Sequence, residues 1–307
     1  DGSIVTCSRE ENPELFSLVL GGYGLFGIIL DVQLEVVPNE RLKVEQFLVP
    51  IDDALASLEQ SLAEQPGASM VYARLNIVPD EFLEEAIVSI FRVEEGDIPT
   101  LTNPDLIALR RALFRGSAES DYGKELRWAA ETQLQPAIAS TVFSRNQLLN
   151  EGVETFENRS ASSTDILHEY FIPREGIDAF LEEVRRIVPF HGGNLLNVTV
   201  RNVETDEDTF LRYADERMYA FVMLFEQART PEAEADMQAM TRELIDSALA
   251  VDGRYYLPYR LHATVEQFHR AYPMAVEFFQ MKQRHDPRGR FRNRFYDRYG
   301  VQDEEAH

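Results

Sequence analysis

The segment from Asn194 to Val203 alternates polar and apolar residues, as a strand with two different faces does. Its polar side carries Asn197, Thr199 and Arg201, which offer an amide, a hydroxyl and a guanidinium in one row. Such a row can bind a polyol or a lactone through directional hydrogen bonds, with Arg201 orienting the ligand. The pattern alone fits a solvated sheet face at least as well.

A second polar cluster lies in the segment Tyr255–His262, where Tyr259, Arg260 and His262 stand close together. A histidine can act as a general base near neutral pH, and a tyrosine can donate a hydrogen bond to an alkoxide. We therefore predict that Tyr259 or His262 handles a proton and that Arg260 contacts the substrate. The alternative is that these side chains pack in the protein with their polar tips in water.

His168 and Tyr170 share one face of a predicted strand, Ile166–Ile172. We predict that they line the same pocket. Packing on the sheet face explains the two side chains equally well.

Gly22, Gly24 and Gly27 match the spacing GxGxxG of dinucleotide-binding loops. That loop must lead into a helix whose N-terminus holds a pyrophosphate, whereas this one leads into Ile28–Val36, which reads as a strand. A glycine loop before a strand still lets a flat ligand approach the backbone closely. A tight turn without a ligand is the alternative.

The elements that position these residues follow one plan twice: strand, proline, helix, strand, strand. The first set comprises 44–49, Pro50, 52–64, 69–78 and 86–93, and the second comprises 166–172, Pro173, 175–188, 194–203 and 217–226. This order is typical of ferredoxin-like split units and predicts an α+β fold with one broad antiparallel sheet and helices on one face.

Further elements flank this core. We predict strands at 3–7 and 27–37, a helix at Pro13–Leu18 that begins after Asn12, and a helix capped by Thr230. Residues 264–284 are predicted to be helical with a break at Tyr272-Pro273, and 96–165 to be mostly helices and loops.

Composition excludes several classes of function. The 53 acidic residues outnumber the 30 basic ones, and a net charge of −23 repels phosphate backbones, so we expect no nucleic-acid partner. The single Cys7 and the spacing of the histidines predict no metal site. The apolar stretch Leu15–Leu34 contains four glycines, so we expect no membrane span. We see no signal peptide and expect a cytoplasmic protein whose first residues belong to the middle of a domain.

The two ends of the chain resemble a known family. Residues 1–8, Asn12–Phe16 and Gly21–Ile29 are similar to the end of the FAD-binding domain of the vanillyl-alcohol oxidase and p-cresol methylhydroxylase (PCMH-type) family. The spacing Lys282, Asp286-Pro287, Phe291, Asn293 and Phe295 is similar to the family's last segment, which returns to that domain. The resemblance implies a remnant of the FAD-binding domain at 1–40, a substrate-binding cap domain at 41–263 with a helical insertion at about 96–165, and a returning segment at 264–307.

The same resemblance implies roles for individual residues. Those on the side of the FAD cofactor are Thr6, Ser8, Gly22, Gly24, Gly27, Ile28 and Asn293. Residues 195–201 are similar to the substrate-pocket strand of sugar-alcohol and aldonolactone oxidases, and Thr199 stands where some relatives carry an acidic residue. Relatives also place a lysine near Tyr259, and this segment has none.

The expected activity is hydride transfer from a hydroxylated small molecule, such as a sugar alcohol or an aldonolactone, to flavin N5. Alternatives are an FAD-dependent dehydrogenase or reductase acting on a lipid-linked or sterol-like substrate, and a fragment that acts only as a flavin-free binding module.

Overall fold

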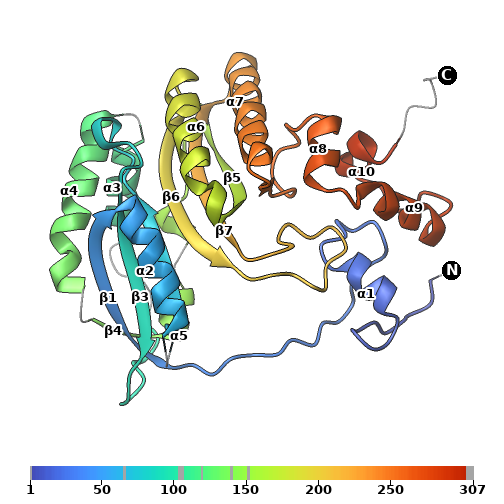
Figure 1. Ribbon diagram of the computed structural model, residues 1–307, viewed down its shortest axis with the longest axis horizontal. Helices are drawn as coiled ribbons and strands as arrows, with labels where there is room; N and C mark the ends of the chain where they lie inside the picture. The colour runs from blue at the N-terminus through green and yellow to red at the C-terminus, as the bar shows by residue number, and fades with distance from the viewer. Residues whose placement is uncertain are drawn as a thin grey trace.

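The computed structural model describes residues 2–64, 67–102, 107–118, 120–138, 141–150 and 153–301. Its centre is an eight-stranded sheet in the order β4-β1-β3-β2-β6-β7-β5-β8, in which every neighbouring pair is antiparallel (Figure 1). The strands are β1 (Arg41–Pro50), β2 (Met70–Leu75), β3 (Glu85–Val93), β4 (Val142–Ser144), β5 (Ser163–Pro173), β6 (Asn194–Val203), β7 (Met218–Ala228) and β8 (Arg254–Tyr255). The predicted broad antiparallel sheet is confirmed.

Two similar units build this sheet. The first is β1, α2 (Ile51–Ala63), β2 and β3, and the second is β5, α6 (Ile177–Phe190), β6 and β7. Pairing of β2 with β6, in which Ala73 lies opposite Val200, joins the units into one surface. The repeated strand–proline–helix–strand–strand order is therefore confirmed by the fold.

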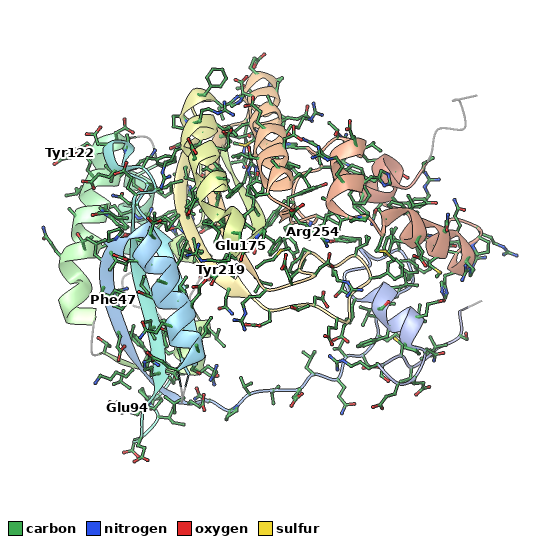
Figure 2. The ribbon with its side chains drawn as sticks, in the orientation of Figure 1. Phe47, Glu94, Tyr122, Glu175, Tyr219 and Arg254 are labelled. Atoms are coloured by element: carbon green, nitrogen blue, oxygen red, sulfur yellow. The ribbon has the colours of Figure 1, made fainter. Side chains whose placement is uncertain are left out.

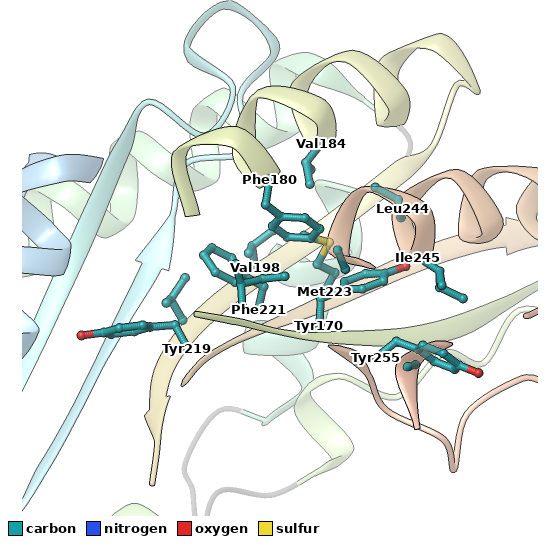
Figure 3. Packing of buried hydrophobic residues seen from close by; sticks show 14 of the residues in the cluster. Tyr170, Phe180, Val184, Val198, Tyr219, Phe221, Met223, Leu244, Ile245 and Tyr255 are labelled. Atoms are coloured by element: carbon teal, nitrogen blue, oxygen red, sulfur yellow. The ribbon is translucent and has the colours of Figure 1, made fainter. Parts of the chain in front are cut away.

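The core lies between the sheet and the helices α2, α6 and α7 (Pro231–Ala250). Figure 3 shows Phe180 of α6 above the strand residues Val198, Phe221 and Tyr170, all of them fully or almost fully buried. Alternate residues of each strand supply this apolar face, because successive side chains of a strand point to opposite sides. Their partners in the alternation form the second face, where the candidate site lies.

The second face is not bare, so the prediction of helices on one face only is wrong. Helices α3 (Ile107–Gly116) and α4 (Asp121–Ile138) cover part of it. Trp128 packs on Val78 and Ile87, and the Arg127 guanidinium donates to the carbonyl oxygen of Leu196 at 2.8 Å. The first half of the sheet thus has helices on both faces, because the sheet buries apolar side chains on both sides there. No helix in the described ranges has the length and apolar character to cross a bilayer.

Helices α1 (Pro13–Val19), α8 (Val265–Ala271), α9 (Ala275–His285) and α10 (Arg294–Tyr299) form the right-hand part of Figure 1. Helix α5 (Arg145–Leu149) lies with the first unit, beside β4. Short 3-10 turns occur at Pro79–Glu81, Val153–Thr155 and Arg174–Gly176. The predicted break between α8 and α9 and the start of α1 at Pro13 are confirmed. Asn12 does not cap α1 with its side chain, since its amide donates to the Thr6 carbonyl oxygen at 2.7 Å instead.

The predicted strands at 3–7 and 27–37 are wrong for this structure. Both segments are extended but join no sheet among the described residues. The alternating apolar pattern is present, yet side chains from Ile28 to Val37 are exposed, with Val36 at 83%. A strand needs a neighbouring backbone for its N–H and C=O groups, and the described part of the chain offers none here.

Candidate functional site

The two ends of the chain meet through Asn293 and Tyr23. The Asn293 side chain begins α10 by accepting from the Tyr296 N–H, and its amide donates to the Tyr23 carbonyl oxygen at 2.6 Å. The Tyr23 ring lies 4.7 Å from the Phe295 ring, centroid to centroid. Residues 13–27 and the last helices therefore form one packed body beside the sheet.

A cleft of about 850 Å³ opens where this body meets helix α7 and the segment Leu257–His262. Its walls include Tyr23, Tyr259, Arg260, His262 and Asn293. It brings together residues from the first thirty positions, the predicted proton-handling segment and the last helices. The volume suffices for a small molecule or for the ring system of a cofactor.

The sheet carries a polar pair, Arg201 and Glu169, which Tyr259 connects to the cleft. An Arg201 guanidinium nitrogen (Nη2) lies 3.6 Å from Glu169 Oε1 across strand β7. The two side chains meet diagonally, because Glu169 pairs with Val222 of β7 and Arg201 pairs with Ala220, two residues further back along that strand.

Tyr259 completes this polar cluster from the segment that follows β8. Its hydroxyl donates to Glu169 Oε2 at 3.2 Å. The segment is docked along the edge of β5, where Tyr255 pairs with Tyr170 and the Tyr256 N–H donates to the Glu169 carbonyl oxygen at 2.9 Å. Backbone pairing thus fixes Tyr259 above Glu169.

Burial sets the protonation of this cluster. It raises the pKa of Glu169, while the Arg201 charge and the Tyr259 hydrogen bond lower it in part. Burial and the neighbouring carboxylate raise the pKa of Tyr259 well above its ordinary value. Near neutral pH Tyr259 is therefore a hydrogen-bond donor, and the only anionic group of the cluster is Glu169.

Aromatic rings border the pair on the same face. The Phe171 and Tyr213 rings stack with centroids 4.1 Å apart, and Tyr256 meets Tyr213 edge to face at 5.5 Å. Arg254 stabilises the loop between β6 and β7, which carries Tyr213. Its guanidinium donates to the Arg212 carbonyl oxygen and forms an ion pair with Asp215. Arg254 is labelled in Figure 2. The result is a packed aromatic cluster next to a carboxylate and a guanidinium.

His262 lies at the cleft wall but is bound to helix α7. Its Nδ1 lies 2.9 Å from the Thr241 hydroxyl and its Nε2 lies 2.9 Å from Glu234 Oε1. Burial lowers its pKa, although Glu234 opposes this shift. With both ring nitrogens engaged, His262 fixes the segment that carries Tyr259. Its predicted role as a base has no support in this geometry.

His168 and Tyr170 share one face of β5, as predicted. Both point to the helix side of the strand, where Tyr170 packs on Phe180 (Figure 3) and bonds His168 Nδ1 at 3.2 Å. They line a narrow cavity of about 20 Å³, space for about one water molecule, together with Glu169, Tyr259 and Arg260. That they line the substrate pocket stays a prediction.

Asn197 and Thr199 lie on the predicted face, with Asn197 partly covered by α4. The Asn197 amide donates to the Thr199 hydroxyl at 3.0 Å, and its Oδ1 accepts from Arg127 at 3.4 Å. Thr199 and Glu169 both pair with Val222 from opposite sides, so they stand in one row. Thr199 is placed to line the site, whereas Asn197 connects it to the helical cover.

The three glycines have different surroundings. A Cβ atom on Gly22 would lie 2.0 Å from the Leu18 carbonyl oxygen, so the turn after α1 itself requires this glycine. Gly24 (φ +71) and Gly27 (φ +155) adopt conformations that favour glycine, and no atom lies within 4 Å of a Cβ built there. Open space over unhindered backbone fits the approach of a flat ring. The adjacent Ile28 is 76% exposed.

Three further predicted residues are placed as follows. The Ser8 hydroxyl accepts from the backbone N–H groups of Glu10 and Glu11, so it closes a turn. Thr6 is exposed, and its carbonyl oxygen accepts from Asn12. Arg260 pairs with Glu234 and lines the cleft. Cofactor contact by Thr6 and Ser8 stays a prediction.

Sequence reasoning missed Glu169 and Tyr23. Glu169 stands between His168 and Tyr170, so the alternation already placed it opposite them. Val198 and Val200 mark the helix side of β6, which leaves Arg201 and hence Glu169 on the other face. Nothing in the sequence around Tyr23 shows that it meets Phe295.

Comparison with known proteins identifies the family of the chain. The family model described as D-arabinono-1,4-lactone oxidase (ALO) matches residues 124–299, more than half of the chain. The chain belongs to this family. The match runs from within α4 to the end of α10 and includes Glu169, Arg201, Tyr259 and Asn293.

Curated relatives extend the similarity. The chain is 27% identical to cytokinin dehydrogenase 8 of Oryza sativa subsp. indica over 203 residues, which cover 58% of this chain and 36% of the relative. It is 23% identical to cytokinin dehydrogenase 6 of Oryza sativa subsp. japonica over 264 residues, 79% of this chain and 49% of the relative. The chain thus spans about a third to a half of these relatives. FAD is the cofactor of both groups, so the predicted FAD-linked oxidoreductase family, with its aldonolactone-oxidase resemblance, is confirmed.

Proposed function

We propose that this chain forms the substrate side of an FAD-dependent oxidoreductase that oxidises a hydroxylated small molecule, of the sugar-alcohol or aldonolactone kind. The observation that carries the proposal is the junction of Tyr23 and Asn293 beside a cleft that Tyr259 also lines. Tyr23 belongs to the glycine turn, and Tyr259 bonds Glu169 on the polar face of the sheet, so the cleft has one residue next to each.

FAD, when bound, supplies a ring whose N5 accepts a hydride from the substrate carbon. Gly24 and Gly27 would hold this ring through close backbone contact, and Asn293 fixes the turn that carries them. Arg201, whose side chain is about half exposed, binds a substrate oxygen, and Thr199 offers a hydroxyl in the same face. These groups orient the substrate carbon and hydrogen-bond its oxygens.

The aromatic cluster supports a second candidate. The partly exposed rings of Tyr213 and Tyr256 offer apolar contact that suits a lipid-linked, sterol-like or planar substrate. The relatives named cytokinin dehydrogenases make a dehydrogenase reaction the natural form of this alternative. A sugar ring also stacks on aromatic side chains, so the cluster fits the first candidate as well.

The experiment is spectroscopic and uses the full-length protein. We expect it to purify with the visible absorption of oxidised flavin and to lose that absorption under anaerobic conditions when the right alcohol is added. A panel of sugar alcohols, aldonolactones, sterols and cytokinins separates the candidates. A colourless protein that takes up no FAD would instead indicate a flavin-free binding module.

The electron acceptor needs a separate measurement. Oxygen consumption is compared with reduction of an artificial dye at equal substrate concentration. Fast oxygen consumption identifies an oxidase, and dye reduction without oxygen consumption identifies a dehydrogenase.

A further inference from the structure

Glu169 is fixed in position by its backbone pairing and by its low exposure. Its backbone pairs with β7 through Val222 and accepts from the Tyr256 N–H, so strands or paired segments flank it on both sides. Its side chain is 11% exposed. The carboxylate therefore has one fixed position on the face that carries Arg201.

The two oxygens of this carboxylate differ in their partners. Oε2 accepts from the Tyr259 hydroxyl at 3.2 Å. Oε1 lies 3.6 Å from the nearest Arg201 nitrogen, beyond normal hydrogen-bond length. Oε1 of Glu169 thus retains capacity to accept a hydrogen bond from a ligand.

The charged and titratable groups that face Glu169 come from three elements. They are Arg201 of β6, Tyr213 of the loop between β6 and β7, and Tyr256 and Tyr259 of the segment after β8. Burial raises the pKa of Tyr213 and of Tyr259, and the Glu169 charge adds to both shifts. Neither phenol supplies a base near neutral pH, and His262 is bound to Thr241 and Glu234.

We propose that Glu169 is the proton acceptor of this site and selects substrates by the hydroxyl group that it deprotonates. In this step the substrate O–H proton passes to Oε1, and the O–H electron pair forms the carbonyl bond. The C–H bond of the carbon that bears this hydroxyl breaks, and its hydrogen leaves as a hydride that the flavin accepts. Arg201 binds a substrate oxygen, and Tyr259 keeps the carboxylate in place through Oε2. This inference rests on the proposed oxidation of a hydroxylated substrate.

The test compares Glu169→Gln with the full-length wild-type flavoprotein. Loss of the base is expected to lower kcat by about 100-fold or more with flavin content unchanged. In the wild type, kcat/KM rises with pH as Glu169 loses its proton, and this rise disappears in the variant. Glu169→Asp keeps a carboxylate, so the pH dependence returns at reduced kcat. Glu175→Gln, an exposed carboxylate at the start of the neighbouring helix (Figure 2), is the control and is expected to match the wild type.

A second readout does not depend on turnover. The ultraviolet absorbance of tyrosinate is followed against pH in the wild type and in Tyr259→Phe. The difference between the two curves gives the pKa of the Tyr259 phenol. In a Glu169→Gln background its pKa is expected to fall, because the neighbouring negative charge is gone. An unchanged pKa of the Tyr259 phenol would show that Glu169 and Tyr259 are not in contact, and the proposal depends on that contact.

The outcomes also separate this proposal from the proposed function. A wild-type protein that oxidises an alcohol while Glu169→Gln keeps its rate and pH profile overturns the role of Glu169 alone. A wild-type flavoprotein that no hydroxylated compound reduces overturns the proposed function, and the proton-acceptor role with it.

Discussion

The Asn293 side chain donates to the Tyr23 carbonyl oxygen at 2.6 Å, across 270 positions of the sequence. The same side chain begins helix α10 through the Tyr296 N–H at 2.9 Å. One amide group therefore fixes both the last helix and the turn that carries Gly24. This contact makes the glycine turn part of the site's wall.

Removing this side chain is expected to destabilise the protein. Asn293→Ala loses a helix cap and a backbone hydrogen bond, which together contribute about 1–3 kcal/mol. Chemical denaturation of the full-length protein measures the loss. Asn293→Asp keeps the acceptor that caps α10 but removes the donor to Tyr23, so it isolates the second contact. Equal stability of Asn293→Asp and wild type would show that the Tyr23 contact contributes nothing.

A side chain at Gly24 is expected to abolish flavin binding. Gly24→Val fills the open space above the turn and also strains a backbone with φ +71. Flavin content per protein chain gives the result. Gly192→Val is the matched control, because Gly192 has φ +60 and equally open surroundings at the end of α6. Flavin retained in both variants would show that Gly24 does not contact the cofactor.

Arg201→Ala is expected to affect catalysis and leave folding nearly unchanged. The side chain is about half exposed, and exposed ion pairs contribute about 0–1 kcal/mol to stability. We expect kcat/KM to fall about tenfold or more, equivalent to about 1.4 kcal/mol, with flavin bound. Steady-state kinetics with the best substrate gives the value. Arg217→Ala removes an arginine that is 59% exposed and pairs with Glu204, and should behave as wild type.

Buried His168 is expected to make the protein sensitive to mild acid. Burial lowers its pKa to about 3 in the folded state, whereas in the unfolded chain it has the ordinary histidine pKa of about 6.5. Between these values only the unfolded state binds the proton, so stability falls as the pH drops. Each pH unit in this window costs about 1.4 kcal/mol, so the loss between pH 6.5 and about pH 5 is about 2 kcal/mol.

Denaturation of His168→Gln at several pH values checks this effect. The variant should lose less stability than the wild type over the same interval, with the remaining slope due in part to His262. His285→Gln changes a histidine at the surface and serves as the comparison. Parallel curves for His168→Gln and wild type would exclude His168 as the source.

Local signals predicted most of the fold. Period-two alternation, the two prolines Pro50 and Pro173, and the Thr230 cap locate the strands and helices of both units to within a few residues. The sequence could not show that α4 packs on the second face, since Trp128 meets Val78 and Ile87 only after the chain has folded. Nor could it reveal that residues 27–37 lack a neighbouring strand.

The candidate site was predictable only in part. Arg201 and Tyr259 were identified from their strand face and their neighbours, and the structure connects both to Glu169. Alternation placed His168 and Tyr170 on one face, but it gives two faces without saying which one is buried against helices. Gly22 matched a ligand motif, but its backbone turn already explains why no side chain fits there.

The exposed segment Ile28–Pro38 connects the glycine turn to strand β1, which lie far apart in the structure although they are close in sequence. It runs from the glycine turn along the lower edge of Figure 1 to β1, at the far half of the sheet. The residues before it are held elsewhere, by Phe210, which donates to the Ser17 carbonyl oxygen, and by Asn293. If the chain were cut within Ile28–Pro38, residues 13–27 would therefore stay bound to Phe210 and to the last helices through these contacts. The attachment of residues 13–27 to the rest of the molecule does not depend on the covalent link to β1.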